Sequence, residues 1–169
     1  MTPPDRAARP VALRHPTPSD GAAVWALVKA CGSLDVNTPY AYLMACHNFA
    51  DTCLVAEDGT DLAGMVLAYR QPSAPSTLFV WQVGVAPSHR GQGLAATMLD
   101  HLVTRITPAV SHVEATINPS NVPSQNLFRA LACRFDAPLT EYTWLSADAF
   151  PDSHEAEDMF RVGPFQKKD

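Results

Sequence analysis

Residues 78–95 read LFVWQVGVAPSHRGQGLA, and this stretch decides the fold. Its first part, Leu78 to Val85, is apolar on both of its alternating faces, which is typical of a strand in the centre of a sheet. The part from Arg90 to Ala95, here called the glycine turn, then opens a helix that continues to about Ile106. The stretch therefore predicts a buried strand, a glycine-rich turn and a helix in direct succession.

The glycine turn has the properties of an anion site. Gly91 and Gly93 allow backbone conformations that are closed to other residues, and they let a ligand approach the chain closely. The unpaired amides at the start of the following helix converge there, where the helix dipole also favours an anion. These amides belong to Gln92, Gly93, Leu94 and Ala95. A pyrophosphate fits this arrangement, and a plain strand-to-helix turn without a ligand is the alternative.

Two other phosphate-binding motifs do not match the glycine turn. A P-loop places a lysine directly after its second glycine, where this chain has Leu94. A dinucleotide-binding fingerprint needs a third glycine, where this chain has Ala96, and it lies in the first strand–helix unit of its domain. Here two helices and three strands are expected before the strand that leads into the turn. The residues at these two positions therefore exclude both motifs.

The remaining chain reads as alternating strands and helices. Strands are expected at residues 11–15, 52–57, 62–70, 113–117, 140–145 and 159–162. Helices are expected from the capping box Thr17–Asp20 to Gly32, then at 40–48 and 121–132, with loops at 34–37 and 71–76. The order predicts an α/β (α+β) layer fold with a mixed sheet. Residues 11–165 are expected to form one domain between disordered tails at 1–10 and 166–169.

Composition narrows the class of protein. The chain has 169 residues, of which 47% are apolar and 17% charged, as in a soluble globular domain. Its net charge of −5 argues against a nucleic-acid partner and suits a cationic substrate. The longest apolar stretch, Leu62 to Tyr69, is too short to cross a membrane, and no secretory signal is apparent, so the cytoplasm is expected. The four cysteines are scattered and suggest buried apolar residues.

The glycine turn resembles the R/Q-x-x-G-x-G/A signature of the GNAT acetyltransferase superfamily. Residues 81–87 resemble its fourth strand, and residues 118–131 resemble its N-x-x-(S/A)…L-(Y/F) helix start. The resemblance implies a mostly antiparallel mixed sheet flanked by helices, with two strands splayed apart. It also implies that acetyl-CoA, the co-substrate, lies along the backbone of Val83 and Val85, with its pyrophosphate on the glycine turn. Asn121, Ser124 and Phe128 would complete that site.

Six further segments resemble the diaminobutyrate acetyltransferase family of ectoine biosynthesis, an osmoprotection pathway. They are LDVN at 34–37, YAYL at 40–43, FADTC at 49–53, FVWQV at 79–83, HEAE at 154–157 and RVGPF at 161–165. The resemblance implies acetylation of the 4-amino group of L-2,4-diaminobutyrate, a cytoplasmic enzyme and a homodimer.

A diamine substrate needs fixed hydrogen-bond acceptors, and Asp35 in a loop before a helix is one candidate. On its own pattern Asp35 is better explained as a turn or cap residue, and only the resemblance favours a role in the site. Tyr40 and Tyr42 offer hydroxyls and an aromatic face to a cation, although spacing places at least one of them in the core. Trp81 shares a predicted strand face with Phe79, Val83 and Val85, which also reads as core. With the resemblance, the expected substrate-binding residues are Asp35, Asn37, Tyr40, Tyr42, Trp81, Thr116, Asn118, His154 and Glu157.

Proton transfer defines the expected catalytic residues. Primary amines are mostly protonated near pH 7, so attack on the thioester needs a base or a water relay. The resemblance places Glu157 beside the amine, and Tyr40 and Asp35 complete the predicted catalytic set. His154 and Glu157 at helical spacing would share a face, but two ligands make a poor metal site, so no metal is expected. Phe128 stands where many GNAT enzymes have an acidic tyrosine; Tyr40, Tyr42 or water could serve instead, or the thiolate could leave unaided.

Two other kinds of protein stay compatible with these residues. One is a GNAT enzyme for a different amine, such as a polyamine, an aminoglycoside or a protein N-terminus. The other is a non-catalytic domain that binds acyl-CoA as a sensor, which Phe128 slightly favours. Release of free thiol with a panel of amines separates all three.

Overall fold

The computed structural model describes residues 11–107 and 109–166, so the expected N-terminal tail and most of the C-terminal one lie outside the described residues. Four α-helices occur in these residues: Gly21–Cys31 (α1), Pro39–Asn48 (α2), Leu94–Ile106 (α3) and Val122–Arg134 (α4). The strands are Ala12–Arg14 (β1), Leu54–Asp58 (β2), Asp61–Gln71 (β3), Ala74–Val85 (β4), His112–Ile117 (β5), Leu139–Leu145 (β6) and Glu157–Val162 (β7). The predicted order of elements is confirmed.

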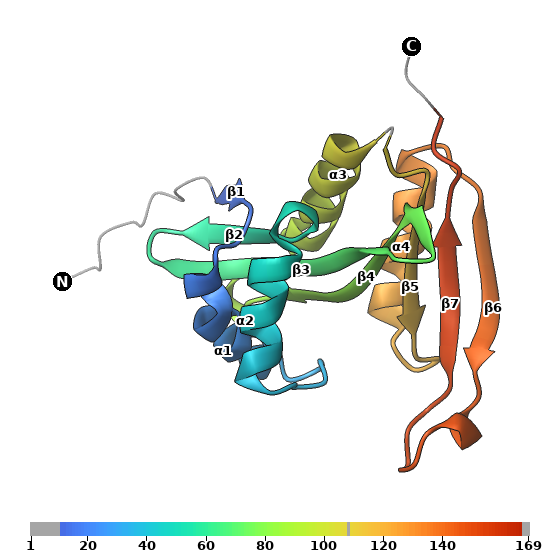
Figure 1. The fold of residues 1–169 in the computed structure, drawn as a ribbon, viewed down its shortest axis with the longest axis horizontal. Coiled ribbons are helices and arrows are strands. Elements are labelled where there is room, and N and C mark those ends of the chain that lie inside the picture. The colour runs from blue at the N-terminus through green and yellow to red at the C-terminus, as the bar shows by residue number, and fades with distance from the viewer. Residues whose placement is uncertain (1–10, 108, 167–169) are drawn as a thin grey trace.

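The seven strands form one mixed sheet in the order β1-β2-β3-β4-β5-β7-β6. The pair β4–β5 is parallel, and every other neighbouring pair is antiparallel. This is the mostly antiparallel sheet that the superfamily resemblance implies, with β4 in the centre as its apolar pattern predicts. In Figure 1, β2, β3 and β4 run horizontally, whereas β5, β7 and β6 run vertically. No helix in the described part of the chain is long and apolar enough to span a membrane.

Two hydrophobic clusters lie on opposite faces of the sheet. Alternation along β2 assigns Leu54 and Ala56 to the cluster that includes α3 and α4, and Val55 to the cluster that includes α1 and α2. Both clusters contain fully buried side chains, such as Leu99 on α3 and Val24 on α1. A residue's face along a strand therefore decides which pair of helices it contacts.

The helix starts and stops follow the predicted caps closely. Asp20 accepts a hydrogen bond from the Thr17 amide at 2.6 Å, and a single 3-10 turn at Pro18–Asp20 precedes α1. Helix α1 ends at Gly32, whose φ of 70° is the left-handed conformation expected there. Thr38 caps α2, and Asn121 caps α4 rather than forming its first residue as predicted.

The loop predicted at 71–76 is wrong. Strand β3 continues to Gln71 and β4 begins at Ala74, and these two residues pair directly. Pro72 lies in the turn, where no ladder hydrogen bond is needed. Pro75 lies in the first part of β4, before Thr77, where the pairing with β5 begins. The two prolines therefore mark positions without ladder partners inside a long hairpin.

Strands β4 and β5 part after a short paired segment, here called the fork. Residues Thr77–Phe79 pair with His112–Glu114, and both strands then continue without pairing with each other. Buried Glu114 closes the paired end: it accepts a 2.6 Å hydrogen bond from Gln71 and forms an ion pair with Arg161 of β7. These contacts tie the two halves of the sheet together just where the strands separate.

A β-bulge at Trp81 corrects one prediction about β4. Leu67 pairs with Gln82 and Ala68 pairs with Val80, so Trp81 is an extra residue with no partner on β3. Trp81 stacks on Tyr42 in the α1–α2 cluster, whereas Val83 and Val85 pack against the α3–α4 cluster. Trp81 therefore does not share a face with Val83 and Val85. Strict alternation fails here because the bulge shifts the pattern by one residue.

Candidate active site

The glycine turn leaves open space for a ligand. Gly91 and Gly93 both have a φ of 74°, and a Cβ atom added at either would meet no atom within 4 Å. Gly93 caps α3, so the amides of the first helical turn have no partner inside the helix. The turn therefore combines exposed amides, the positive end of a helix dipole and free space, as an anion site requires.

Arg90 contributes to this turn in a different way from its neighbours. Its guanidinium group donates a 2.6 Å hydrogen bond to the carbonyl oxygen of Cys31, the last residue of α1. The side chain thus fastens the turn to the end of that helix. Arg90 was predicted to contact the cofactor, and in the structure its backbone lies in the turn while its side chain holds α1.

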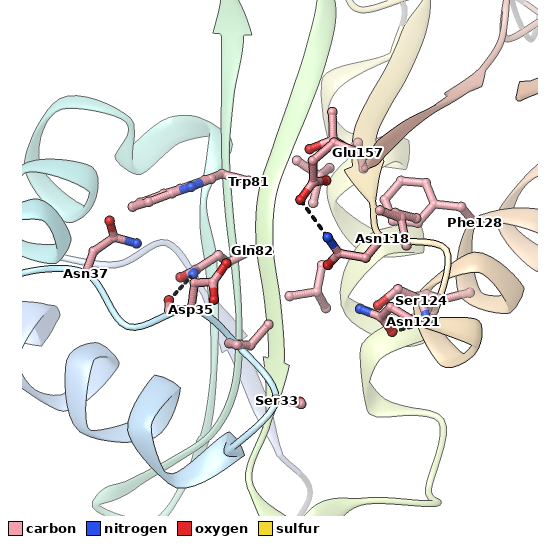
Figure 2. Close-up of a pocket in the computed structure, with 17 residues that line it drawn as sticks. Ser33, Asp35, Asn37, Trp81, Gln82, Asn118, Asn121, Ser124, Phe128 and Glu157 are labelled. Atoms are coloured by element: carbon pink, nitrogen blue, oxygen red, sulfur yellow. Dashed lines mark hydrogen bonds between the residues drawn. The ribbon is translucent and has the colours of Figure 1, made fainter. Parts of the chain in front are cut away.

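A cavity of about 330 Å³ lies between the parted strands. Figure 2 shows side chains from the α1–α2 loop and β4 on one wall, and side chains from β5, α4 and β7 on the other. Ten predicted site residues line the cavity: Asp35, Asn37, Trp81, Val83, Thr116, Asn118, Asn121, Ser124, Phe128 and Glu157. The structure therefore collects residues from five separate segments of the chain into one site.

The first wall depends on a loop at Ser33–Asn37, here called the substrate loop. The carbonyl oxygen of Asp35 accepts hydrogen bonds from Gln82 at 2.8 Å and from the Tyr42 hydroxyl at 3.4 Å. The Asn37 amide donates to the same hydroxyl at 3.1 Å. The Asp35 side chain itself is 91% exposed. The backbone of the loop is thus fixed, and its carboxylate is left available to a ligand.

The second wall presents an oriented carboxylate. Glu157 is the first residue of β7, and its side chain is only 16% exposed. Asn118, directly after β5, donates a hydrogen bond to Glu157 Oε1 at 3.0 Å (Figure 2). Nearby, Asn121 accepts a hydrogen bond from the Ser124 amide at 3.2 Å and so caps α4. The amide of Asn118 fixes the rotamer of a carboxylate that faces the cavity.

His154 lies between the carboxylates of the two walls. Its Nε2 atom is 3.8 Å from Asp35 Oδ2 and 3.8 Å from Glu157 Oε1, and its ring stacks on Phe150. The pKa of His154 is raised, first by its hydrogen bond to the Glu155 carbonyl and then by the nearby carboxylates, although desolvation opposes the shift. The proximity of His154 and Glu157 does not come from a helix, because residues 154–156 have no regular structure and Glu157 begins a strand.

Three predicted residues occupy other positions. Tyr40 is 67% exposed and does not line the cavity. Tyr42 is fully buried, and its hydroxyl holds the substrate loop. Val85 lies further along β4, between the cavity and the glycine turn. Phe128 does line the cavity, and it is 2% exposed with no proton to donate. The described residues contain no group of three or more potential metal ligands from histidine, cysteine, aspartate and glutamate.

Sequence reasoning missed Gln82, which lines the cavity and is 7% exposed. The signal was present, because Gln82 is the one amide side chain in an otherwise apolar strand interior, Leu78 to Val85. A buried polar group in such a strand needs a partner, and here its nitrogen bonds the substrate loop. Ser33 and Leu34 at the start of that loop were missed as well, and no local signal distinguishes them.

Comparisons with known proteins agree on one family. The model of the acetyltransferase (GNAT) family matches residues 22–132. L-2,4-diaminobutyric acid acetyltransferase of Shouchella clausii is 45% identical over 156 residues, covering 91% of this chain and 87% of that protein. The enzyme of the same name from Halomonas elongata is 44% identical over 162 residues, covering 94% and 84%.

A solved structure extends the agreement to three dimensions. Diaminobutyrate acetyltransferase EctA from Paenibacillus lautus, solved with L-2,4-diaminobutyric acid and coenzyme A, superposes with a TM-score of 0.88 at 43% identity. The match covers 94% of this chain and 97% of that one. A putative acetyltransferase from Salmonella typhimurium, at 16% identity and a TM-score of 0.73, shares the fold.

Proposed function

Because this chain belongs to the diaminobutyrate acetyltransferases of the GNAT family, we propose that it transfers the acetyl group of acetyl-CoA to the 4-amino group of L-2,4-diaminobutyrate. The product, N4-acetyl-L-2,4-diaminobutyrate, would serve ectoine biosynthesis. One observation supports this most directly. A cavity between the parted segments of β4 and β5 carries a carboxylate on each wall, Asp35 and Glu157, and so suits a small molecule with two ammonium groups.

The residues that would hold acetyl-CoA fit its chemistry. The exposed amides from Gln92 to Ala95 suit the pyrophosphate, and the open space above Gly91 and Gly93 leaves room for it. The edge of β4 from Val83 to Val85 has no strand partner on the β5 side, so it can bond an extended pantetheine chain as a strand would. Asn121 and Ser124 border the same gap. The co-substrate supplies an activated acetyl group, and the chain supplies its position.

Glu157 is the proposed base for the reacting amine. An amine near pH 7 attacks a thioester only after it loses a proton, and a positioned carboxylate can accept it. Asn118 orients Glu157 through Oε1, and His154 Nε2 lies 3.8 Å from the same oxygen. The amide of Val83 would hold the developing oxyanion. Phe128 has no proton to donate. When the C–S bond of the thioester breaks, either a water protonates the departing thiolate of coenzyme A or the thiolate leaves unprotonated.

The substrate's remaining groups match the rest of the cavity. Asp35 offers its exposed carboxylate to the second ammonium group. The raised pKa of His154, due first to its hydrogen bond to the Glu155 carbonyl, favours its protonated form, and we propose that its ring faces the substrate carboxylate. A polyamine has no carboxylate to match His154, which favours an amino acid as the substrate.

We also propose that two copies of the chain associate through β6. This strand is the outer strand of the sheet, and most of its residues are exposed, including Tyr142 at 47% and Trp144 at 52%. An exposed edge strand with large apolar side chains favours pairing with another strand. Light scattering coupled to gel filtration should give twice the mass of one chain, and the Trp144→Glu variant should have the mass of a single chain.

The four free cysteines fit a reducing compartment such as the cytoplasm.

The function is tested by thiol release from acetyl-CoA with four amines: L-2,4-diaminobutyrate, ornithine, lysine and spermidine. Diaminobutyrate is expected to give the highest kcat/KM, and NMR of the product should place the acetyl group on N4. Spermidine turnover at or above that of diaminobutyrate would transfer the proposal to a polyamine. Binding of acetyl-CoA without repeated turnover for any amine would identify a sensor domain.

A further inference from the structure

Gln82 carries a buried acceptor that no described residue satisfies. The side chain is 7% exposed, and its Oε1 atom has no hydrogen-bond partner among the residues of the structure. Leaving a buried carbonyl oxygen without a partner costs about 1–3 kcal/mol, so such groups are rare outside functional sites. Gln82 also lines the cavity between the two walls. The residue with the unsatisfied oxygen therefore borders the space in which a substrate would lie.

The orientation of the Gln82 amide follows from its other contact. Nε2 lies 2.8 Å from the carbonyl oxygen of Asp35, which can only accept a hydrogen bond (Figure 2). The nitrogen must therefore occupy that position, and Oε1 is left as the free end. An amide oxygen accepts hydrogen bonds and has none to donate, so its ligand must be a donor. In a diamine substrate, that donor is an ammonium group.

The position of Gln82 selects which ammonium group this is. Gln82 is on the same wall as Asp35 and bonds its backbone, whereas Glu157 projects from the opposite wall with Asn118. Glu157 is the group that can remove a proton, so the reacting 4-amino group belongs on its side. The 2-ammonium group, which stays charged throughout, is then left for Asp35 and Gln82.

Resting on the function proposed above, we infer that Gln82 Oε1 accepts a hydrogen bond from the 2-ammonium group of the substrate and makes the enzyme selective for 2,4-diamino acids. The Asp35 carboxylate supplies the negative charge that attracts this ammonium group, and Gln82 supplies a hydrogen-bond acceptor in a fixed orientation. Because the 2-ammonium group has the same charge before and during acetyl transfer, this contact should affect KM more than kcat.

The test compares two variants on two substrates. Gln82→Met keeps the length of the side chain but removes both the Oε1 acceptor and the Nε2 donor to the substrate loop. Gln82→Glu keeps an oxygen acceptor and removes the Nε2 donor alone. The substrates are L-2,4-diaminobutyrate and 4-aminobutyrate, which has the same reacting amine and carboxylate but no 2-ammonium group. Values of kcat/KM are taken from single turnovers with excess enzyme, so that slow substrates are measured too.

Gln82→Met is expected to lower kcat/KM at least tenfold for diaminobutyrate and less than threefold for 4-aminobutyrate. Gln82→Glu should keep the wild-type preference for diaminobutyrate or increase it. Equal losses on both substrates in Gln82→Met, or a loss of diaminobutyrate preference in Gln82→Glu as large as in Gln82→Met, would reduce Gln82 to a support of the substrate loop and overturn the inference. A wild-type enzyme that does not acetylate diaminobutyrate would instead overturn the proposed function. Thermal unfolding and coenzyme A affinity near wild-type values confirm that each variant is folded.

Discussion

The glycine turn and the substrate cavity, the two proposed ligand sites, are built in opposite ways along one strand. The turn would bind with backbone amides, so its requirements are positive φ angles at Gly91 and Gly93 and open space above them. The cavity would bind with side chains, and its carboxylates and amides come from loops and strands far apart in the chain. A backbone site is determined by a few consecutive residues, whereas a side-chain site forms only when the fold brings distant residues together.

This difference predicts that the two sites can be changed separately. Substitutions in the turn should weaken coenzyme A binding whatever the amine, because they alter the backbone proposed to hold the pyrophosphate. Substitutions in the cavity should alter the amine and leave coenzyme A affinity intact. The four changes below test that separation in order of decreasing effect.

Glu157→Gln should lower kcat for diaminobutyrate about a hundredfold, because a positioned base commonly contributes that much or more. The amide keeps the size of the side chain and can still accept the hydrogen bond from Asn118. Coenzyme A affinity by calorimetry should stay at the wild-type value. The matched control is Glu155→Gln, two residues earlier, which contacts Ser120 instead of the cavity. A Glu157→Gln enzyme with wild-type kcat would remove Glu157 as the base.

Gly93→Val should weaken coenzyme A binding at least tenfold. A β-branched residue resists the φ of 74°, and its side chain would occupy the free space of the anion site. Gly59→Val is the control, because Gly59 has a φ of 67° and equally open surroundings in the β2–β3 turn. Both variants should lose similar stability, but only Gly93→Val should lose affinity in a calorimetric titration. Equal affinities in the two variants would count against the turn as the pyrophosphate site.

Asp35→Asn should raise KM for diaminobutyrate about tenfold with a smaller change in kcat. The substitution removes the negative charge that would pair with the non-reacting ammonium group, so the ground state and the transition state lose the same interaction. The loop should keep its shape, since its hydrogen bonds involve the Asp35 carbonyl and not the side chain. Steady-state kinetics of Asp51→Asn, an exposed aspartate outside both sites, provide the baseline. Coenzyme A affinity that falls with Asp35→Asn would break the separation of the two sites.

Asp20→Asn should lower stability without affecting either ligand. Arg14 binds Asp20 through two hydrogen bonds of 2.8 Å, and this holds the Asp20 pKa down at about 2. A carboxyl whose pKa is depressed by folding stabilises the protein above its unfolded pKa, and that contribution disappears as the pH falls toward 2. Because Arg14 is partly exposed, we expect a loss of only about 1 kcal/mol at pH 7.

Urea unfolding at pH 7, 4 and 2.5 measures this loss. The difference between wild type and Asp20→Asn should shrink steadily as the pH falls, and Asp61→Asn should show no such trend. A difference that grows on acidification would contradict the sign of the linkage. Kinetic constants equal to wild type at pH 7 would confirm that this ion pair is separate from both ligand sites.

The order of elements followed from local rules. Caps such as Thr38 followed by Pro39, and the left-handed glycine at Gly32, are decided by neighbouring residues and were predicted correctly. The central position of β4 followed from its apolar pattern. The hairpin at 71–74 was missed because proline excludes a residue from a hydrogen-bonded ladder position, and only the sheet shows which positions have no partner there.

The cavity was less predictable from single residues. Asp35 and Glu157 were expected there only through resemblance, since an aspartate in a loop and a glutamate in an acidic run have ordinary structural explanations. Tyr40 and Tyr42 were grouped by sequence, yet one is 67% exposed and the other fully buried, because a helix turns its side chains by about 100° per residue. The opposite facing of Trp81 and Val83 depends on a register shift with β3, which no local pattern encodes.

The single extra residue at Trp81 has a consequence for how this enzyme can diversify. Downstream of it, odd and even positions of β4 face different surroundings: Gln82 bonds the substrate loop, and Val83 packs against the α3–α4 cluster. Removing that residue would exchange the two sets in one step and damage both sites together. New substrate ranges in this scaffold should therefore arise by replacing side chains along β4, while its length stays constant.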